Sequence, residues 1–183
     1  MNFIGMEKVR DGKYLKNYEL IYQNKAGKEK KYEIVSRKNL VNPEDLGKHS
    51  SGVSIIATKG DKFLLLHEFR MGVNKKIYNL CAGMQEENET IEECISRELY
   101  EETGLELKEI KLILPPSYAA VAISDTKTHI AFVEVDGEIE DHSSDNEEIE
   151  ASFYSKEDVK ELLRTCEFSS RAQMAAYYFA YGK

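Results

Sequence analysis

The chain has 183 residues, of which 42% are hydrophobic and 32% are charged, and its formal net charge is −8 at pH 7. This length and composition are typical of a globular protein with one main core. The negative charge argues against a broad nucleic-acid-binding surface. No run approaches the roughly 18 apolar residues that a membrane helix needs, and the N-terminus does not read as a secretory signal. We therefore expect a cytoplasmic protein with no nucleic-acid or membrane partner.

The first 48 residues are expected to form an extension to the main fold. Two runs that carry tyrosine and isoleucine, residues 14–22 and 31–37, flank the turn-like segment 24–28, which is typical of a β-hairpin. We therefore divide the chain into an N-terminal β-hairpin extension, residues 1–48, and a main domain, residues 49–183.

The main domain mixes strands with helices. Apolar runs at 53–58 and 62–69, joined by a Gly-Asp turn, predict two paired strands. An irregular stretch is expected up to Gly83. The remaining elements are predicted in chain order as a helix at 90–103, strands near 110–114 and at 128–135, an acidic loop at 136–146, a strand at 149–154, and helices at 155–164 and 170–181. This order indicates an α/β domain with a mixed sheet.

The helix predicted at residues 90–103 has both ends marked in the sequence. Thr90 and Glu93 have the spacing of a capping box, which satisfies free backbone donors at a helix start. Gly104 is placed to end the helix in a left-handed conformation. At about 100° per residue, the apolar side chains form one stripe that should face the core, namely Ile91, Cys94, Ile95 and Leu99.

Glutamates interrupt this apolar stripe. Glu98 and Glu102 project within it, and Glu101 lies at its edge. Carboxylates on a partly buried face near the C-terminal end of a helix are costly unless a positive charge meets them. A hard divalent cation such as Mg²⁺ suits this task, since one or two carboxylates hold it together with substrate phosphates. The helix therefore points to phosphate chemistry, although a solvated acidic helix is the alternative.

A longer pattern surrounds the helix. All nine fixed positions of G-x5-E-x7-R-E-U-x-E-E-x-G-U, in which U is a bulky aliphatic residue, are filled by Gly83, Glu89, Arg97, Glu98, Leu99, Glu101, Glu102, Gly104 and Leu105. By this pattern, the Nudix box, the chain resembles the Nudix hydrolase superfamily. The resemblance implies a Nudix-type α/β/α sandwich with a mixed sheet, to which the N-terminal β-hairpin would be added.

The resemblance also implies roles for residues of the box. Glu98 and Glu102 would be the principal metal ligands, and the carbonyl of Ala82 would be a further ligand. Glu101 would assist with the metal or with the attacking water. The implied cofactor is Mg²⁺, with Mn²⁺ as the alternative. Two further box residues, Arg97 and Glu89, would brace the helix against the loop before it.

Segments outside the box resemble the ADP-ribose pyrophosphatase-like subgroup. These are the pair Phe69-Arg70, the segment 79–83 and the acidic loop that ends at residues 146–149. In this resemblance Arg70 and Gly83 would contact the substrate, and Glu147 would be the general base, a role that a box glutamate could take instead. The N-terminal strands of the subgroup often form a dimer, so a homodimer is expected. The chain departs from the subgroup at Asn79, Cys81 and Asn88, which replace Glu, Pro and Gly.

The implied activity is Mg²⁺-dependent hydrolysis of the pyrophosphate bond in a nucleoside diphosphate linked to another moiety. ADP-ribose or a similar nucleotide sugar is the expected substrate, and two monophosphates are the products. Two alternatives stay open. The enzyme would instead act on a dinucleotide cofactor or a nucleoside triphosphate, or the protein would bind a nucleotide without cleaving it.

Overall fold

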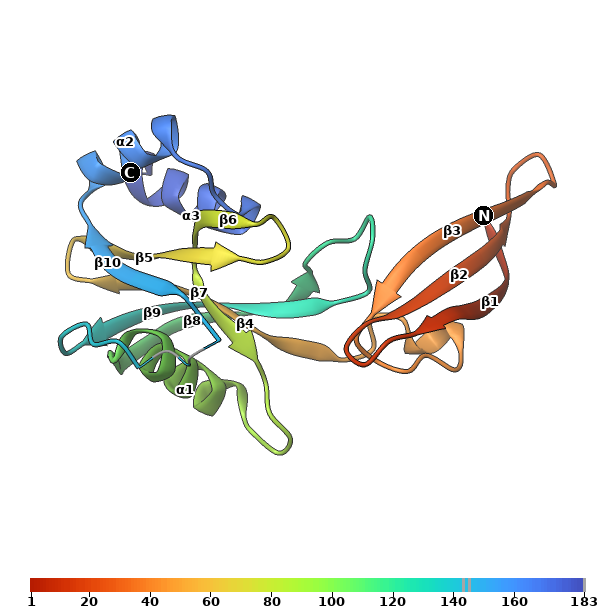
Figure 1. Ribbon diagram of the computed structural model, residues 1–183, viewed down its shortest axis with the longest axis horizontal. Helices are drawn as coiled ribbons and strands as arrows, with labels where there is room; N and C mark the ends of the chain where they lie inside the picture. The colour runs from red at the N-terminus through yellow and green to blue at the C-terminus, as the bar shows by residue number, and fades with distance from the viewer. Residues whose placement is uncertain (143, 145, 183) are drawn as a thin grey trace. The chain divides into compact units, whose positions relative to one another are not determined.

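The protein forms two compact units (Figure 1), and the computed structural model describes residues 1–142, 144 and 146–182. Unit 1 comprises Met1–Ser51 and Pro116–Thr128, and unit 2 comprises Gly52–Pro115 and the chain from His129 onward. The first division lies close to the boundary expected from the sequence between residues 48 and 49. The segment 116–128, however, belongs to unit 1.

Unit 1 is built on a three-stranded antiparallel sheet. Its strands are β1 (Asn2–Asp11), β2 (Lys16–Gln23) and β3 (Glu29–Ser36), in the order β1-β2-β3. The predicted hairpin is the β2–β3 pair, and the side chain of Asn24 accepts hydrogen bonds from backbone N–H groups in its turn. Strand β1 was not predicted from the sequence, because most of its side chains are exposed and give no clear alternation.

The sheet of unit 2 has seven strands. Five follow the order β10-β5-β4-β9-β8, while β6 pairs with β5 and β7 pairs with β4. These strands are β4 (Ser50–Lys59), β5 (Lys62–Arg70), β6 (Lys75–Asn79), β7 (Cys81–Met84), β8 (Glu106–Tyr118), β9 (Lys127–Asp136) and β10 (Ile149–Tyr154). The turn between β4 and β5 contains Gly60 with φ of 61°, as the Gly-Asp pair predicts.

Helices cover both faces of this sheet (Figure 1). They are α1 (Ile91–Thr103), α2 (Lys156–Thr165) and α3 (Ser170–Tyr181). Alternate residues of β5 point to opposite faces of the sheet. Leu64 and Leu66 pack in the core that includes α1, whereas Phe63 and Leu65 pack with α2 and α3. The expected α/β/α sandwich is confirmed. Among the described residues, no helix is long and apolar enough to cross a membrane.

One part of the sequence prediction for unit 2 is wrong, and one predicted strand is present but longer than expected. The stretch expected to be irregular up to Gly83 contains the short strands β6 and β7. The strand expected near 110–114 is the longer β8, in which several exposed charged side chains mask the alternation. The predicted acidic loop at 136–146 includes residues 143 and 145, which lie outside the described residues.

Candidate active site

The box segment folds as its local sequence signals predict. Thr90 is the N-cap of α1 and forms the capping box with Glu93, and Gly104 ends the helix with φ of 72°. In the loop before the helix, Asn88 has φ of 65°. This conformation explains why the Nudix subgroup commonly has glycine there, and asparagine is among the side chains that tolerate it best.

Arg97 joins this loop to the helix. Its Nε donates to Glu89 Oε1 at 2.7 Å, and its NH2 group donates to Glu89 Oε2 at 3.0 Å and to the Met84 carbonyl at 3.0 Å. Its NH1 group donates to Glu98 at 2.8 Å and to Glu101 at 2.9 Å. The expected bracing by Arg97 and Glu89 is therefore present, and the same guanidinium also orients two of the box carboxylates.

The carboxylates of Glu98 and Glu102 lie in a poorly solvated environment. Glu98 is 8% exposed, and burial raises its pKa although Arg97 opposes the shift. Burial raises the pKa of Glu102 to about 8, which outweighs the opposing hydrogen bonds from the Cys81 thiol and the Ala82 N–H. Like-charge repulsion from Glu98 adds to this effect. By contrast, Glu101 is exposed.

Gly83 is required by the space that Glu98 occupies. A Cβ atom at residue 83 would lie 1.7 Å from Cδ of Glu98, far inside van der Waals contact. A second close approach lies behind it, because a Cβ at Gly52 on β4 would lie 1.9 Å from the carbonyl oxygen of Gly83. The absence of a side chain at Gly83 thus lets the Glu98 carboxylate reach the backbone of β7, and its absence at Gly52 lets β4 approach the Gly83 carbonyl.

A hollow of about 330 Å³ brings most of the predicted site residues together. Arg70, Ala82, Glu102 and Glu147 all line it, although they come from three strands or loops and from the helix. Glu147 is exposed and accepts a hydrogen bond from Ser144 at 2.9 Å. The lining also includes a residue that the sequence analysis did not select, the buried Glu68.

This donor set fits a magnesium ion. The carboxylates next to the hollow are oxygen ligands, which Mg²⁺ prefers, and burial disfavours their charge unless a cation compensates it. Within the described part of the chain, no three His, Cys, Asp or Glu side chains form a ready metal-binding group. In proteins, Mg²⁺ is typically held by one or two carboxylates, and water and substrate phosphates complete its coordination shell.

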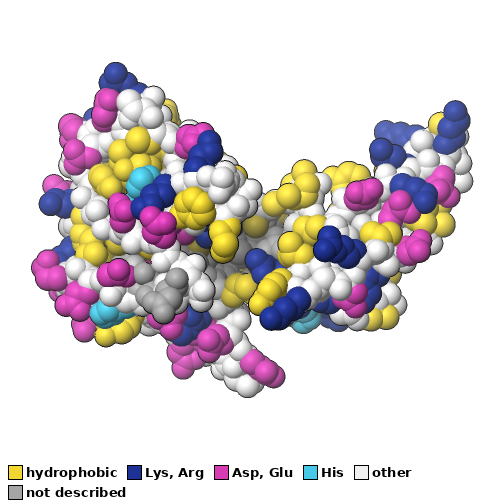
Figure 2. Space-filling view, in the orientation of Figure 1, with side chains coloured by type: hydrophobic (Ala, Val, Ile, Leu, Met, Phe, Trp, Pro, Cys, Tyr) yellow, Lys and Arg dark blue, Asp and Glu magenta, His cyan; other side chains and the backbone are white. Residues whose placement is uncertain are grey.

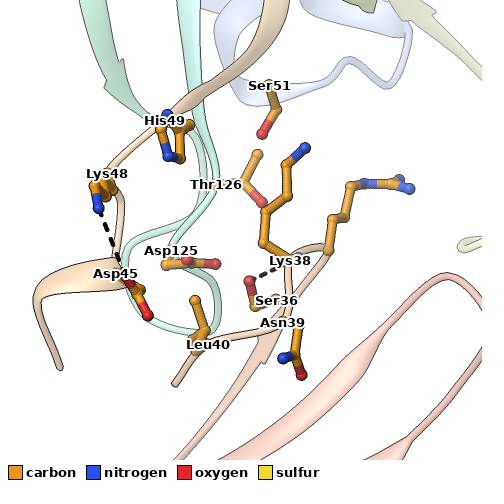
Figure 3. A pocket seen from close by; sticks show the side chains of 11 residues that line it. Ser36, Lys38, Asn39, Leu40, Asp45, Lys48, His49, Ser51, Asp125 and Thr126 are labelled. Carbon is orange, nitrogen blue, oxygen red and sulfur yellow. Dashed lines mark hydrogen bonds and ion pairs between the residues drawn. The ribbon is translucent and has the colours of Figure 1, made fainter. Parts of the chain in front are cut away.

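The surface around α1 is acidic. On the face shown in Figure 2, Asp and Glu side chains gather where Figure 1 places α1 and the loop before it. Another hollow, of about 360 Å³, lies within unit 1 and is drawn in Figure 3. Its lysines and His49 are exposed, and Lys48 pairs with Asp45. No residue of the box lines it, so the candidate active site is the hollow next to α1.

Comparisons with known proteins identify the class. A model of the NUDIX domain family matches residues 48–177, which is more than half of the chain, and the chain belongs to this family. The family recognised from the box is therefore confirmed, and with it the expectation of a Nudix pyrophosphohydrolase.

Two curated relatives and one solved structure are similar to the chain over different lengths. The ADP-ribose pyrophosphatase of Bacillus subtilis (strain 168) is 26% identical over 179 residues, which cover 96% of this chain and 90% of the relative. The NAD-capped RNA hydrolase NudC of Stutzerimonas stutzeri (strain A1501) is 32% identical over 71 residues, 39% of this chain and 23% of that relative. A crystal structure of an ADP compounds hydrolase matches in fold, with a TM-score of 0.74, 18% identity, and coverage of 97% of this chain and 90% of that chain.

The ion pair between Arg97 and Glu89 should stabilise the fold in a pH-dependent way. Arg97 lowers the pKa of Glu89 from 4.5 to about 2, so the pair stabilises the fold fully above pH 4.5, and this contribution is lost as the pH falls toward 2. Glu89→Gln should lower the free energy of unfolding by about 1–3 kcal/mol at pH 7. Urea unfolding at several pH values measures this, with the exposed Glu87→Gln as control. An equal deficit at pH 7 and at pH 2.5 would contradict the pairing.

The close approach of the Glu98 carboxylate to Gly83 should be necessary for activity. Gly83→Ala should displace the Glu98 carboxylate and reduce nucleotide hydrolysis on the order of 10²-fold, since a shift of about 1 Å can cost that much. The fold should persist, because a side chain end can move aside. Circular dichroism and turnover check both points, and Gly5→Ala, which meets nothing within 4 Å, is the control. Full activity in Gly83→Ala would show that the Glu98 position is unimportant.

Proposed function

We propose that this Nudix protein hydrolyses ADP-ribose or a closely similar nucleotide sugar with the help of Mg²⁺ and releases two monophosphates. The observation that carries the proposal is the hollow in which Arg70 and Glu102 face one space, with Glu98 adjacent on α1. A cation and an arginine can together bind the charged pyrophosphate. The Bacillus subtilis relative, which is named an ADP-ribose pyrophosphatase and aligns over 96% of this chain, supports the substrate class.

Each residue has a part in the proposed reaction. Glu98 and Glu102 would hold Mg²⁺ together with the Ala82 carbonyl, and the bound ion would offset the negative charge that develops on the pyrophosphate. Arg70 binds a substrate phosphate. Glu147 takes a proton from the water that attacks one phosphorus atom, while the bond from that phosphorus to the bridging oxygen breaks. The second phosphate leaves with the bridging oxygen, so no phosphoenzyme forms.

Other box residues support this chemistry indirectly. Glu101 is exposed and paired with Arg97 at 2.9 Å, so we assign it an assisting role with the metal or the water. Gly83 lies against the Glu98 carboxylate, and its contact with the substrate stays a prediction. Mn²⁺ can replace Mg²⁺ in such an oxygen-rich site. Homodimer formation and a cytoplasmic location stay predictions.

A dinucleotide is the second candidate substrate. The relative NudC, named an NAD-capped RNA hydrolase, aligns over 71 residues, and a dinucleotide contains the same kind of pyrophosphate bond. A non-catalytic nucleotide-binding protein is the remaining alternative. It is disfavoured because a purely binding protein does not need the complete set of carboxylates that this chain keeps at buried or costly positions.

The substrate is tested with a panel of ADP-ribose, other nucleotide sugars, NAD-type dinucleotides and nucleoside triphosphates, with and without Mg²⁺. We expect cleavage of ADP-ribose above the rest, only with metal, followed by phosphate release with a coupling phosphatase. Glu98→Gln should abolish most of this turnover, whereas the exposed Glu92→Gln on the same helix should not. Preference for another compound would correct the substrate. Binding without cleavage across the panel would favour the non-catalytic alternative.

The role of Glu147 is tested by Glu147→Gln. The amide cannot accept the proton of the water, so kcat should fall by roughly 10²–10⁴-fold while KM changes little. The matched control is Glu138→Gln, because Glu138 is a glutamate with a 93% exposed side chain that does not line the hollow. Unchanged kcat in Glu147→Gln would move the general base to a box glutamate.

A further inference from the structure

Glu68, near the end of β5, carries a carboxylate that is buried beside the hollow. Its side chain is 6% exposed. It lies two residues beyond Leu66 on the strand face that packs toward α1, so the charge continues an apolar row. A buried carboxylate is strongly destabilising unless donors meet its oxygens. The donors around Glu68 therefore indicate why the residue is present.

Each oxygen of Glu68 has its own donor. Oε1 accepts a hydrogen bond from Nδ2 of Asn79 at 2.5 Å, and Oε2 accepts one from NH1 of Arg70 at 3.2 Å. Arg70 is 56% exposed at its side chain and lines the hollow. The carboxylate thus connects a residue of β6 to the arginine that faces the substrate space.

The orientation of Asn79 is fixed from the start of α3. Ser169, the N-cap of α3, accepts a hydrogen bond from the Ala172 N–H at its Oγ and donates its own proton to Oδ1 of Asn79 at 2.6 Å. The amide nitrogen of Asn79 is then the group that faces Glu68. Backbone hydrogen bonds hold the segment before α3 against β6, since Ser169 N donates to the Tyr78 carbonyl at 2.9 Å.

We propose that Glu68 is a positioning residue, which holds the guanidinium of Arg70 at the hollow so that its remaining donors can bind a phosphate of the substrate. The proposal rests on the proposed function, in which Arg70 contacts the pyrophosphate. A guanidinium has five N–H donors in a planar fork, so one hydrogen bond to Glu68 leaves the others free. Without that anchor, an exposed arginine side chain samples many rotamers and loses more entropy on binding.

A rival role for Glu68 is direct metal binding, because it lies close to the box carboxylates. The geometry favours positioning, since both oxygens already accept hydrogen bonds from cationic or amide donors. The two roles differ in what they predict. A positioning residue acts through Arg70 and changes substrate binding, whereas a metal ligand changes the Mg²⁺ concentration that half-activates the enzyme.

The test is a double-mutant cycle of Glu68→Gln and Arg70→Gln, measured as kcat and KM for the substrate that the panel identifies. Glu68→Gln alone should raise KM about tenfold with kcat within about twofold, and in the Arg70→Gln background it should add less than about twofold. The matched control is Glu150→Gln, an exposed glutamate on the neighbouring strand β10. An equal rise in KM in both backgrounds, or a raised Mg²⁺ requirement, would overturn the proposal.

A charge exchange separates positioning from folding. Asn79→Asp alone puts a second carboxylate beside Glu68 and should lower the melting temperature by roughly 5 °C. Adding Glu68→Gln restores a carboxylate–amide pair, so the melting temperature should recover, while KM should stay raised because the charge facing Arg70 has gone. Recovery of KM to the unaltered value would overturn the proposal, since the charge at residue 68 would then be unnecessary.

Failure of the proposed function gives a different result from failure of the positioning role of Glu68. If the unaltered protein cleaves no compound of the panel, the function is wrong, and the same cycle is read in the dissociation constant of ADP-ribose by calorimetry. Loss of affinity in Glu68→Gln that disappears in the Arg70→Gln background still supports positioning. Equal affinity of all four proteins for ADP-ribose rejects it.

Discussion

The guanidinium of Arg97 sits between the loop that precedes α1 and the carboxylates on α1, and the geometry of the site follows from that contact. It meets three glutamates and the Met84 carbonyl, so it is fully occupied and cannot turn toward the hollow. One positive charge shared among three negative charges leaves an excess of negative charge. Arg97 thereby holds the loop and the helix together. The box carboxylates keep a net negative charge that a bound cation would compensate.

Three carboxylates near the hollow, the buried Glu68 and Glu98 and the half-buried Glu102, have their negative charge compensated to different degrees. Glu98 shares Arg97, and Glu68 receives Arg70 and Asn79. Among the described residues Glu102 accepts hydrogen bonds from neutral donors alone, and burial raises its pKa to about 8. Of these three carboxylates, Glu102 is thus the one that lines the hollow without a cationic partner. A cation bound beside Glu102 would gain the most electrostatic free energy, because arginines already compensate part of the charge of Glu98 and Glu68.

Much of the fold was predictable because its signals are local. The capping box at Thr90, the left-handed Gly104 and the β2–β3 turn depend on a few neighbouring residues, and the structure has each of them. The short strand β7 was missed because its partner, β4, lies far away in the sequence. Strand β6 pairs with the preceding β5, but it is short and begins with two lysines, so it gives no clear strand pattern. Of the candidate site, the box could be read as a linear pattern, and Arg70 and Glu147 through a family resemblance. Glu68 could not, because alternation along β5 predicts which face it occupies but not that Asn79 and Arg70 meet it there.

Space is as much a constraint on this site as charge. A Cβ at Gly52 on β4 would enter the Gly83 carbonyl on β7, and a Cβ at Gly83 would enter the carboxylate of Glu98 on α1. Because Gly83 carries no side chain, the Glu98 carboxylate of α1 can lie against the backbone of β7. The box glycine therefore sets how far the helix carboxylate stands from the strand that carries Ala82. In the proposed metal site, a longer distance would weaken binding of one ion by Glu98 and Ala82 together, so Gly83 would affect the metal geometry although it has no side chain to supply a ligand.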